Sequence, residues 1–246
     1  MIDAHCHLDK INDMPIEEVI KKCEEEGIRV ITSCASIEEK EFALKLAEKY
    51  KIVFVTLGLH PTRAEKMDEK ELEDYIEFIK RNREKIVGIG ETGMDKFVED
   101  ERKEKEVFEK FIELAIKLNL PLVIHCRGKM EEAIEILESY NPKSVLFHCY
   151  SGNATQLKRI LENGWFVSIA TNIENIKNTK KAAKKVPLDK FTLETDSPWL
   201  DPFSKELKNK PWNIKYTAQK IAEMRNLEKD YILEMAKRNA ERLFRL

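Results

Sequence analysis

The chain has 246 residues and a formal net charge of −2, with 42% hydrophobic and 36% charged residues. This composition is typical of a packed globular protein and excludes collagen-like, low-complexity and disordered chains. The near balance of charge also excludes a global basic field for nucleic acid, so any phosphate binding must be local.

Apolar periodicity along the chain alternates between short β-branched runs and amphipathic stretches. The expected strands cover residues 1–8, 28–35, 52–60, 86–91, 120–126, 144–149, 165–170 and 191–196. The helices expected after them cover residues 16–26, 38–49, 69–81, 100–118, 130–140, 155–162, 176–185 and 214–225, and a final helix covers 228–244. Several strands are apolar on both faces, as parallel strands covered by helices are.

These eight strand–helix units predict an α/β fold, a closed (β/α)₈ TIM barrel with an extra C-terminal helix, built as a single domain over residues 1–246. An open doubly wound sheet is the alternative, although eight units in this length close more naturally into a barrel. In such a barrel the catalytic residues lie at the C-terminal ends of the strands.

All five histidines fall at the C-terminal ends of expected strands; they are His5, His7, His60, His125 and His148. Alternation along a strand places His5 and His7 on one face, directed into the barrel mouth. Imidazole is a common metal donor, and Glu91 and Asp196 end two further strands. This clustering favours metal binding over histidines that merely form hydrogen bonds.

Four histidines and two carboxylates exceed the ligand set of one tetrahedral zinc ion and suit two divalent ions bridged by a carboxylate. We expect Glu91 to bridge them, because its strand stands between the first strand and the fifth and sixth. The expected ligands are His5, His7, Glu91 and Asp196 for one ion, and Glu91, His125 and His148 for the other. Zn, Mn, Mg, Co and Ni all suit such donors, so the sequence leaves the metal open.

Six ordered segments resemble the successive motifs of the TatD family, a group of metal-dependent deoxyribonucleases among the amidohydrolase-like barrels. The segments are 3–9 (DAHCHLD), 58–61 (GLHP), 90–95 (GETGMD), 124–127 (IHCR), 148–152 (HCYSG) and 193–198 (LETDSP). The resemblance runs from residue 2 to residues 239–244. It implies a (β/α)₈ barrel, a two-metal site and phosphodiester hydrolysis, with the six ligands named above.

Three positions depart from the usual pattern of that family. Thr62 stands where a second His usually follows the His-Pro pair, and Gly128 stands where an acidic residue usually follows His-x-Arg. The usual Arg-Asn-x-Pro of the loop after the eighth strand is replaced by residues 208–211 (KNKP). None of these positions is an expected ligand, so they bear on substrate preference rather than on the reaction class.

Two further residues are candidates for catalysis beside Asp196 and Glu91. Arg127 follows the expected ligand of its strand by two residues, so its guanidinium is placed to hold a phosphate oxygen; a salt bridge to Asp95 or Glu194 is the alternative. His60 either contacts substrate phosphate or is a hydrogen-bonded histidine at a strand end. We expect Asp95 to orient a ligand imidazole through its other nitrogen.

Three segments of the chain are rich in lysine. The loop 199–212 interleaves aromatic rings with lysines, which suits base stacking and phosphate pairing, and packing of the rings against the last helix is the alternative. The charged runs at 99–109 and 177–185 predict solvated helix faces and carry no functional claim.

The sequence therefore predicts a metal-dependent hydrolase that cleaves DNA phosphodiester bonds, at single-stranded or 3′ ends, with a water activated by two metal ions. Asp196 would orient or deprotonate this water. The alternatives are a hydrolase of carbonyl centres, such as a cyclic amidase or an aminoacyl-tRNA deacylase, and a metal-bearing binding protein without activity. Glu91 stands at the end of the fourth strand, where a carbamylated lysine bridge would need a lysine, and this favours the nuclease.

Cysteine usage and the absence of a long apolar segment predict the compartment. The five cysteines are an odd number without a C-x-x-C pair, which favours reduced thiols over a disulfide framework. No window approaches ~20 apolar residues, and the N-terminus lacks the layout of a secretion signal. We expect a cytoplasmic protein with no membrane association and no obligate protein partner.

Overall fold

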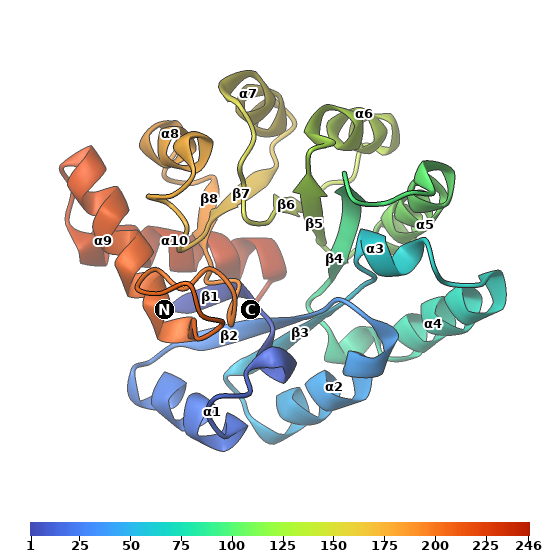
Figure 1. Ribbon diagram of the computed structural model, residues 1–246, viewed down its shortest axis with the longest axis horizontal. Coiled ribbons are helices and arrows are strands. Elements are labelled where there is room, and N and C mark those ends of the chain that lie inside the picture. The colour runs from blue at the N-terminus through green and yellow to red at the C-terminus, as the bar shows by residue number, and fades with distance from the viewer.

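The computed structural model describes residues 1–246 and shows eight parallel strands that follow one another in chain order around a nearly closed barrel (Figure 1). The strands are β1 (Ile2–Cys6), β2 (Arg29–Cys34), β3 (Val53–Leu57), β4 (Gly88–Asp95), β5 (Leu122–Arg127), β6 (Val145–Phe147), β7 (Phe166–Ile169) and β8 (Phe191–Leu193). The predicted TIM-barrel fold is confirmed.

The helices surround the strands as a second layer (Figure 1). They are α1 (Ile16–Glu25), α2 (Lys40–Lys49), α3 (Pro61–Ala64), α4 (Glu69–Arg81), α5 (Glu101–Leu118), α6 (Met130–Tyr140), α7 (Ala154–Glu162), α8 (Lys177–Lys185), α9 (Ile214–Arg225) and α10 (Lys229–Phe244). The short α3 was not predicted from the sequence. None of the helices combines the length and the apolar character that a membrane crossing requires.

Local chemistry at the helix ends explains why the predicted boundaries fall close to the observed ones. A capping box of Asp68 and Glu71 starts α4, and one of Asn153 and Gln156 starts α7. Asn119 ends α5 in the left-handed region at φ 53°, a conformation that asparagine tolerates better than most residues.

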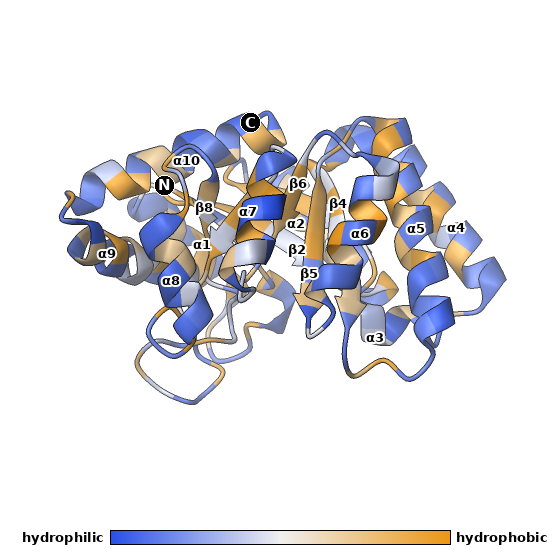
Figure 2. Ribbon diagram, turned by 90° about the horizontal axis from the view of Figure 1, so that it is seen from above, coloured by the Kyte–Doolittle hydropathy of each residue, from blue (hydrophilic) through white to orange (hydrophobic).

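Alternate positions of the strands pack into two separate apolar clusters. The larger cluster lies between strands and helices, and the smaller one joins Val123 of β5, Leu146 of β6 and Phe166 of β7 to the end of α10. Leu243 and Phe244 of α10 complete this smaller cluster, which fills the bottom of the barrel. Figure 2 shows α10 at one end of the molecule and the longest loop at the other.

A β-bulge in β1 turns the two histidines of this strand into the barrel mouth. The register between β1 and β2 shifts between Asp3 and Cys6. Ala4 therefore belongs to the cluster inside the barrel, whereas Cys6 packs in the cluster between strands and helices. His5 and His7 face the mouth because the bulge reverses the inward face of the strand.

A second bulge, in β4, contains Glu91. The register with β5 shifts between Ile89 and Thr92, and the strand continues beyond Glu91 to its end. Gly93, at φ +148°, lets the two strands approach closely, since a Cβ there would lie 2.0 Å from the carbonyl oxygen of His125. The close approach brings Glu91 and His125 into one site.

The segment after β8 closes the barrel against β1. The backbone N–H of Asp196 donates to the carbonyl of His5 at 3.0 Å. The buried carboxylate of Asp3 accepts hydrogen bonds from the backbone N–H of Thr195 at 2.9 Å and from its hydroxyl at 2.6 Å. The seam of the barrel thus positions Asp196 beside the histidines of β1.

Candidate metal centre

Four side chains converge at the mouth of the barrel: His5, His7, Glu91 and Asp196. Nε2 of His5 lies 3.1 Å from Nε2 of His7 and 2.9 Å from Oε2 of Glu91. Oδ1 of Asp196 lies 3.5 Å from Nε2 of His7 and 3.7 Å from Nε2 of His5. The two imidazoles and the Glu91 carboxyl group are almost completely buried.

The spacing of these atoms fits the ligand shell of a divalent ion. A tetrahedral ion with bonds of about 2.1 Å holds its ligand atoms about 3.4 Å apart. The measured separations lie between 2.9 Å (His5 to Glu91) and 3.7 Å (His5 to Asp196). Oε2 of Glu91 is also buried without a hydrogen-bond partner. The residues present therefore fit a bound metal.

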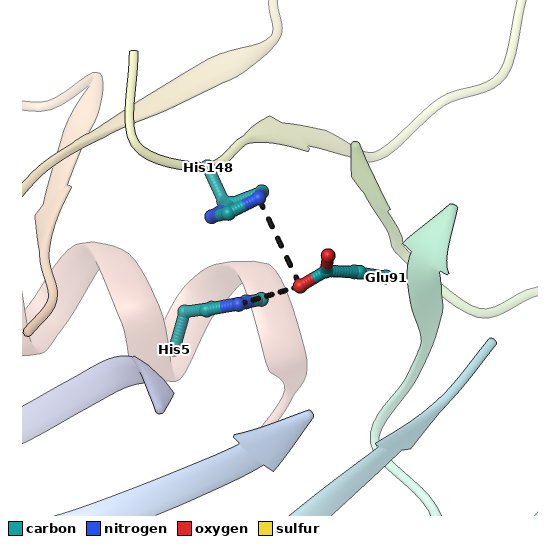
Figure 3. A group of neighbouring side chains, drawn as sticks. All are labelled: His5, Glu91 and His148. Carbon is teal, nitrogen blue, oxygen red and sulfur yellow. Dashed lines mark ion pairs between the residues drawn. The ribbon is translucent and has the colours of Figure 1, made fainter. Parts of the chain in front are cut away.

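His125 and His148 also lie beside Glu91. Nδ1 of His125 is 3.2 Å from Nε2 of His148 and 3.5 Å from Oε1 of Glu91. Nε2 of His148 also lies 3.9 Å from Oε2 of Glu91, and its ring stacks on that of His5 with centroids 4.0 Å apart (Figure 3). All six expected ligands are therefore in one cluster, with the two oxygens of Glu91 facing different neighbours.

A second layer of acidic side chains holds these histidines. Oδ2 of Asp95 lies 2.8 Å from Nε2 of His125, as expected for an orienting carboxylate. Oε1 of Glu194 lies 3.4 Å from Nδ1 of His148 and accepts a hydrogen bond from the backbone of Cys149. This role of Glu194 was not predicted from the sequence, although its spacing of two residues from Asp196 was a usable signal.

The electrostatics of the site keep its carboxylates ionised. Burial disfavours the Glu91 carboxylate, but the adjacent imidazoles of His5 and His7 outweigh this and hold its pKa well below the usual value. Burial likewise opposes the charge on Asp196, yet His7 lowers its pKa overall. A buried pair of anions among histidines is a site that attracts a cation.

A further group of possible ligands does not compete for the ion. His7, Asp9 and Glu39 lie within ligand distance of one another. The ammonium of Lys10 already pairs with Asp9 at 2.7 Å and with Glu39 at 2.6 Å. The ammonium group of Lys10 thus occupies the place that a metal ion would need.

Comparison with known proteins identifies the family. The family model described as TatD related DNase matches residues 2–245. The chain belongs to the TatD family. An uncharacterized metal-dependent hydrolase from Methanocaldococcus jannaschii is 37% identical to it over 245 residues, which are 99% of this chain and 96% of the relative.

Two further TatD relatives show how far the similarity extends. The human protein named deoxyribonuclease TATDN3 is 29% identical over 99% of this chain and 94% of its own. The crystal structure of YjjV, a TatD homologue from Escherichia coli, superposes with a TM-score of 0.91 at 26% identity and covers 100% of this chain and 98% of its own. This protein is thus a metal-dependent hydrolase with the TatD fold.

The departure from the TatD pattern at position 62 falls beside His60. The backbone N–H of Thr62 donates to Nδ1 of His60 at 3.2 Å, so the proton of the neutral ring lies on Nε2. That nitrogen is 3.5 Å from Oε1 of Glu91. His60 therefore faces the cluster, and Thr62 orients it.

Arg127 is paired with Asp95, which is the alternative that the sequence left open. Its Nε and Nη2 donate to Oδ2 of Asp95 at 2.9 and 2.6 Å, and its guanidinium lies 4.7 Å from the ring centroid of Phe97. The side chain remains half exposed. The departure at Gly128 has a steric reason, because a Cβ there would lie 2.8 Å from Cβ of Lys96.

The loop 199–212 contributes less to a nucleic-acid surface than its sequence suggests. Lys210 is buried and its ammonium pairs with Asp13 at 2.8 Å, so it is not available to phosphate. Lys22 covers the ring of Trp212 at 4.0 Å. Only part of the loop is exposed, with Phe203 the most exposed large apolar side chain of the protein. For Lys210 the structure does not favour phosphate pairing, and its long-range partner Asp13 was invisible in the sequence.

Proposed function

We propose that this protein is a deoxyribonuclease that binds two divalent metal ions and cleaves the phosphodiester bonds of DNA at single-stranded or 3′ ends. One observation carries the proposal: the five other expected ligands converge around Glu91 at the barrel mouth. The printed name of the human relative supports DNA as the substrate class. We further propose that residues 1–246 work as one barrel domain.

The proposed division of the ligands shares Glu91 between two ions. His5, His7 and Asp196 would hold one ion with Glu91, whereas His125 and His148 would hold the other with the same carboxylate. Bound divalent ions supply the Lewis acidity that makes a water nucleophilic near neutral pH and offsets charge on a phosphate.

The remaining groups act on the substrate and on its proton. Asp196 stays ionised at neutral pH and retains some exposure, which suits it to orient a water and accept its proton. Arg127 is held by Asp95 with its outer edge exposed, so it can donate to a phosphate oxygen. His60 presents an N–H toward Glu91 and is the next candidate for proton transfer.

The test is hydrolysis by the purified protein of labelled single-stranded DNA, double-stranded DNA, RNA and a simple carboxylic ester, each with Zn, Mn, Mg, Co or Ni. We expect metal-dependent cleavage of DNA, fastest on single strands, and two ions per chain by elemental analysis. Turnover of the ester without cleavage of any nucleic acid would instead assign the site to carbonyl chemistry. One ion at full activity would overturn the two-metal proposal.

A further inference from the structure

Helices α7 and α8 are neighbours in the outer layer of the barrel (Figure 1), and residues of both line a groove. Its cavity has a volume of about 490 Å³ and is lined by Leu157 and Ala182 together with the polar side chains of Asn178, Lys181 and Lys185. The groove therefore combines apolar contact area with two ammonium groups.

A second cavity continues this groove toward the metal centre. It has a volume of about 430 Å³ and shares Asn153 and Asn178 with the first cavity. It extends to Cys126, which follows the expected ligand His125 directly in β5. The two cavities adjoin and together run from α8 to residues at the C-terminal ends of β5 and β6, and none of the expected metal ligands lines either cavity.

The charge of α8 is exceptional in this protein. The helix has no acidic residue and carries Lys177, Lys180, Lys181, Lys184 and Lys185. None of these lysines forms an ion pair, whereas lysines of other helices do, such as Lys80 with Glu77 and Lys103 with Glu69. In a chain with a net charge of −2, this helix is a local positive strip of lysines without ion pairs, although Lys180 lies near enough to Glu174 to act on its charge.

The carboxylates that line the groove do not neutralise the strip. Glu131 of the second cavity pairs with Arg159. Glu162 lines a neighbouring cavity that also contains Lys185, and its carboxylate lies 3.6 Å from the ammonium of Lys158. Glu132 also lines the second cavity, whereas no carboxylate lines the first. The positive charge is therefore concentrated in the first cavity, between α7 and α8.

We infer that this groove binds the sugar–phosphate backbone of a DNA strand whose cleavable end lies at the metal centre, an inference that rests on the proposed function. Ammonium groups that form no ion pair attract phosphates, and the apolar residues between them contact sugars or bases. The nine residues of α8 span about 13 Å, enough to follow a strand over more than one nucleotide. The groove extends the substrate site from a single phosphodiester to a polynucleotide.

The test compares two double variants with the same change of charge. Lys181→Gln with Lys185→Gln alters the groove, and Lys70→Gln with Lys105→Gln alters exposed, unpaired lysines of α4 and α5 as a control. Binding of the metal-loaded protein to a cleavage-resistant phosphorothioate strand of about 20 nucleotides is measured against salt. Cleavage of an unmodified strand and of a dinucleotide is measured in parallel, and melting temperatures confirm folding.

We expect the groove variant to bind the strand roughly tenfold more weakly and to lower the salt slope by about 1.4, which corresponds to two lost phosphate contacts. Cleavage of the dinucleotide should not change, and the control variant should match the wild type. Equal losses in both variants, or none in the groove variant, would overturn the inference. Binding that depends on Lys181 and Lys185 without any DNA cleavage would leave the groove intact and refute the proposed function instead.

Discussion

The two ends of the barrel interior differ in chemistry although the same strands build both. At the bottom, Val123 and Leu146 pack against Phe244 of α10 in a dry apolar cluster. Two residues further along β5 and just beyond β6, His125 and His148 replace them at the mouth. Because side chains alternate with a period of two, the inward face of one strand contributes apolar residues to the bottom and expected metal ligands to the mouth. Stability and chemistry can therefore be disturbed separately.

The largest expected effect is on the rate, from a change at the mouth. Asp196→Asn should lower kcat by roughly 10²–10⁴-fold, because the amide cannot accept the proton of a water. We expect the variant to fold, to retain substantial metal, and to stay slow in excess metal. Kinetics and metal analysis check this, with Asp189→Asn on the surface as the control. Full rescue by added Mn or Zn would show that Asp196 is a ligand only.

The corresponding change at the bottom should act on stability. Phe244→Ala removes a ring that is 3% exposed and should lower the free energy of unfolding by about 3–5 kcal/mol. At low temperature kcat should remain near the wild-type value, because the mouth is unchanged. Denaturant unfolding measures the effect, and Phe203→Ala, at 72% exposure, should change it by less than about 0.5 kcal/mol. A loss of kcat without a loss of stability would show that the two ends are coupled.

A smaller effect is expected from the layer that holds the ligands. Asp95→Asn should weaken metal affinity by about 10–100-fold, since His125 loses the carboxylate that orients it. Arg127→Ala removes the other partner of Asp95 and should raise KM for DNA while leaving metal affinity unchanged. Competition with a chelator and steady-state kinetics separate the two. If both variants lose metal equally, the ion pair holds the site together as a unit.

The smallest effect concerns the pH dependence of metal affinity. It should arise at the mouth, because the cluster at the bottom is apolar. Burial opposes charge on His148, but Glu194 outweighs it and raises its pKa to about 9 in the metal-free protein. A ligand imidazole must lose this proton, so metal affinity should rise by up to about tenfold per pH unit between pH 7 and pH 9 and fall on acidification. Calorimetry at several pH values measures this slope. A constant affinity from pH 7 to pH 9 would contradict a protonated His148.

Much of this protein could be predicted from its sequence because the decisive signals are local. The hydrophobic period marked all eight strands and the surrounding helices, and the capping residues brought the predicted ends of helices such as α4 close to the observed ones. Histidines and carboxylates at strand ends predicted the cluster, and the structure brings all six expected ligands together. Their assignment as metal ligands stays a prediction.

Only the tertiary structure decided how the strands present these side chains. The bulges of β1 and β4 turn His5, His7 and Glu91 into the mouth, and a bulge depends on register with the neighbouring strand. The pairing of Lys210 with Asp13 likewise joins positions far apart in the chain. Such contacts are set by the closure of the barrel, in which each strand is placed by its neighbours, and no local pattern of residues encodes them.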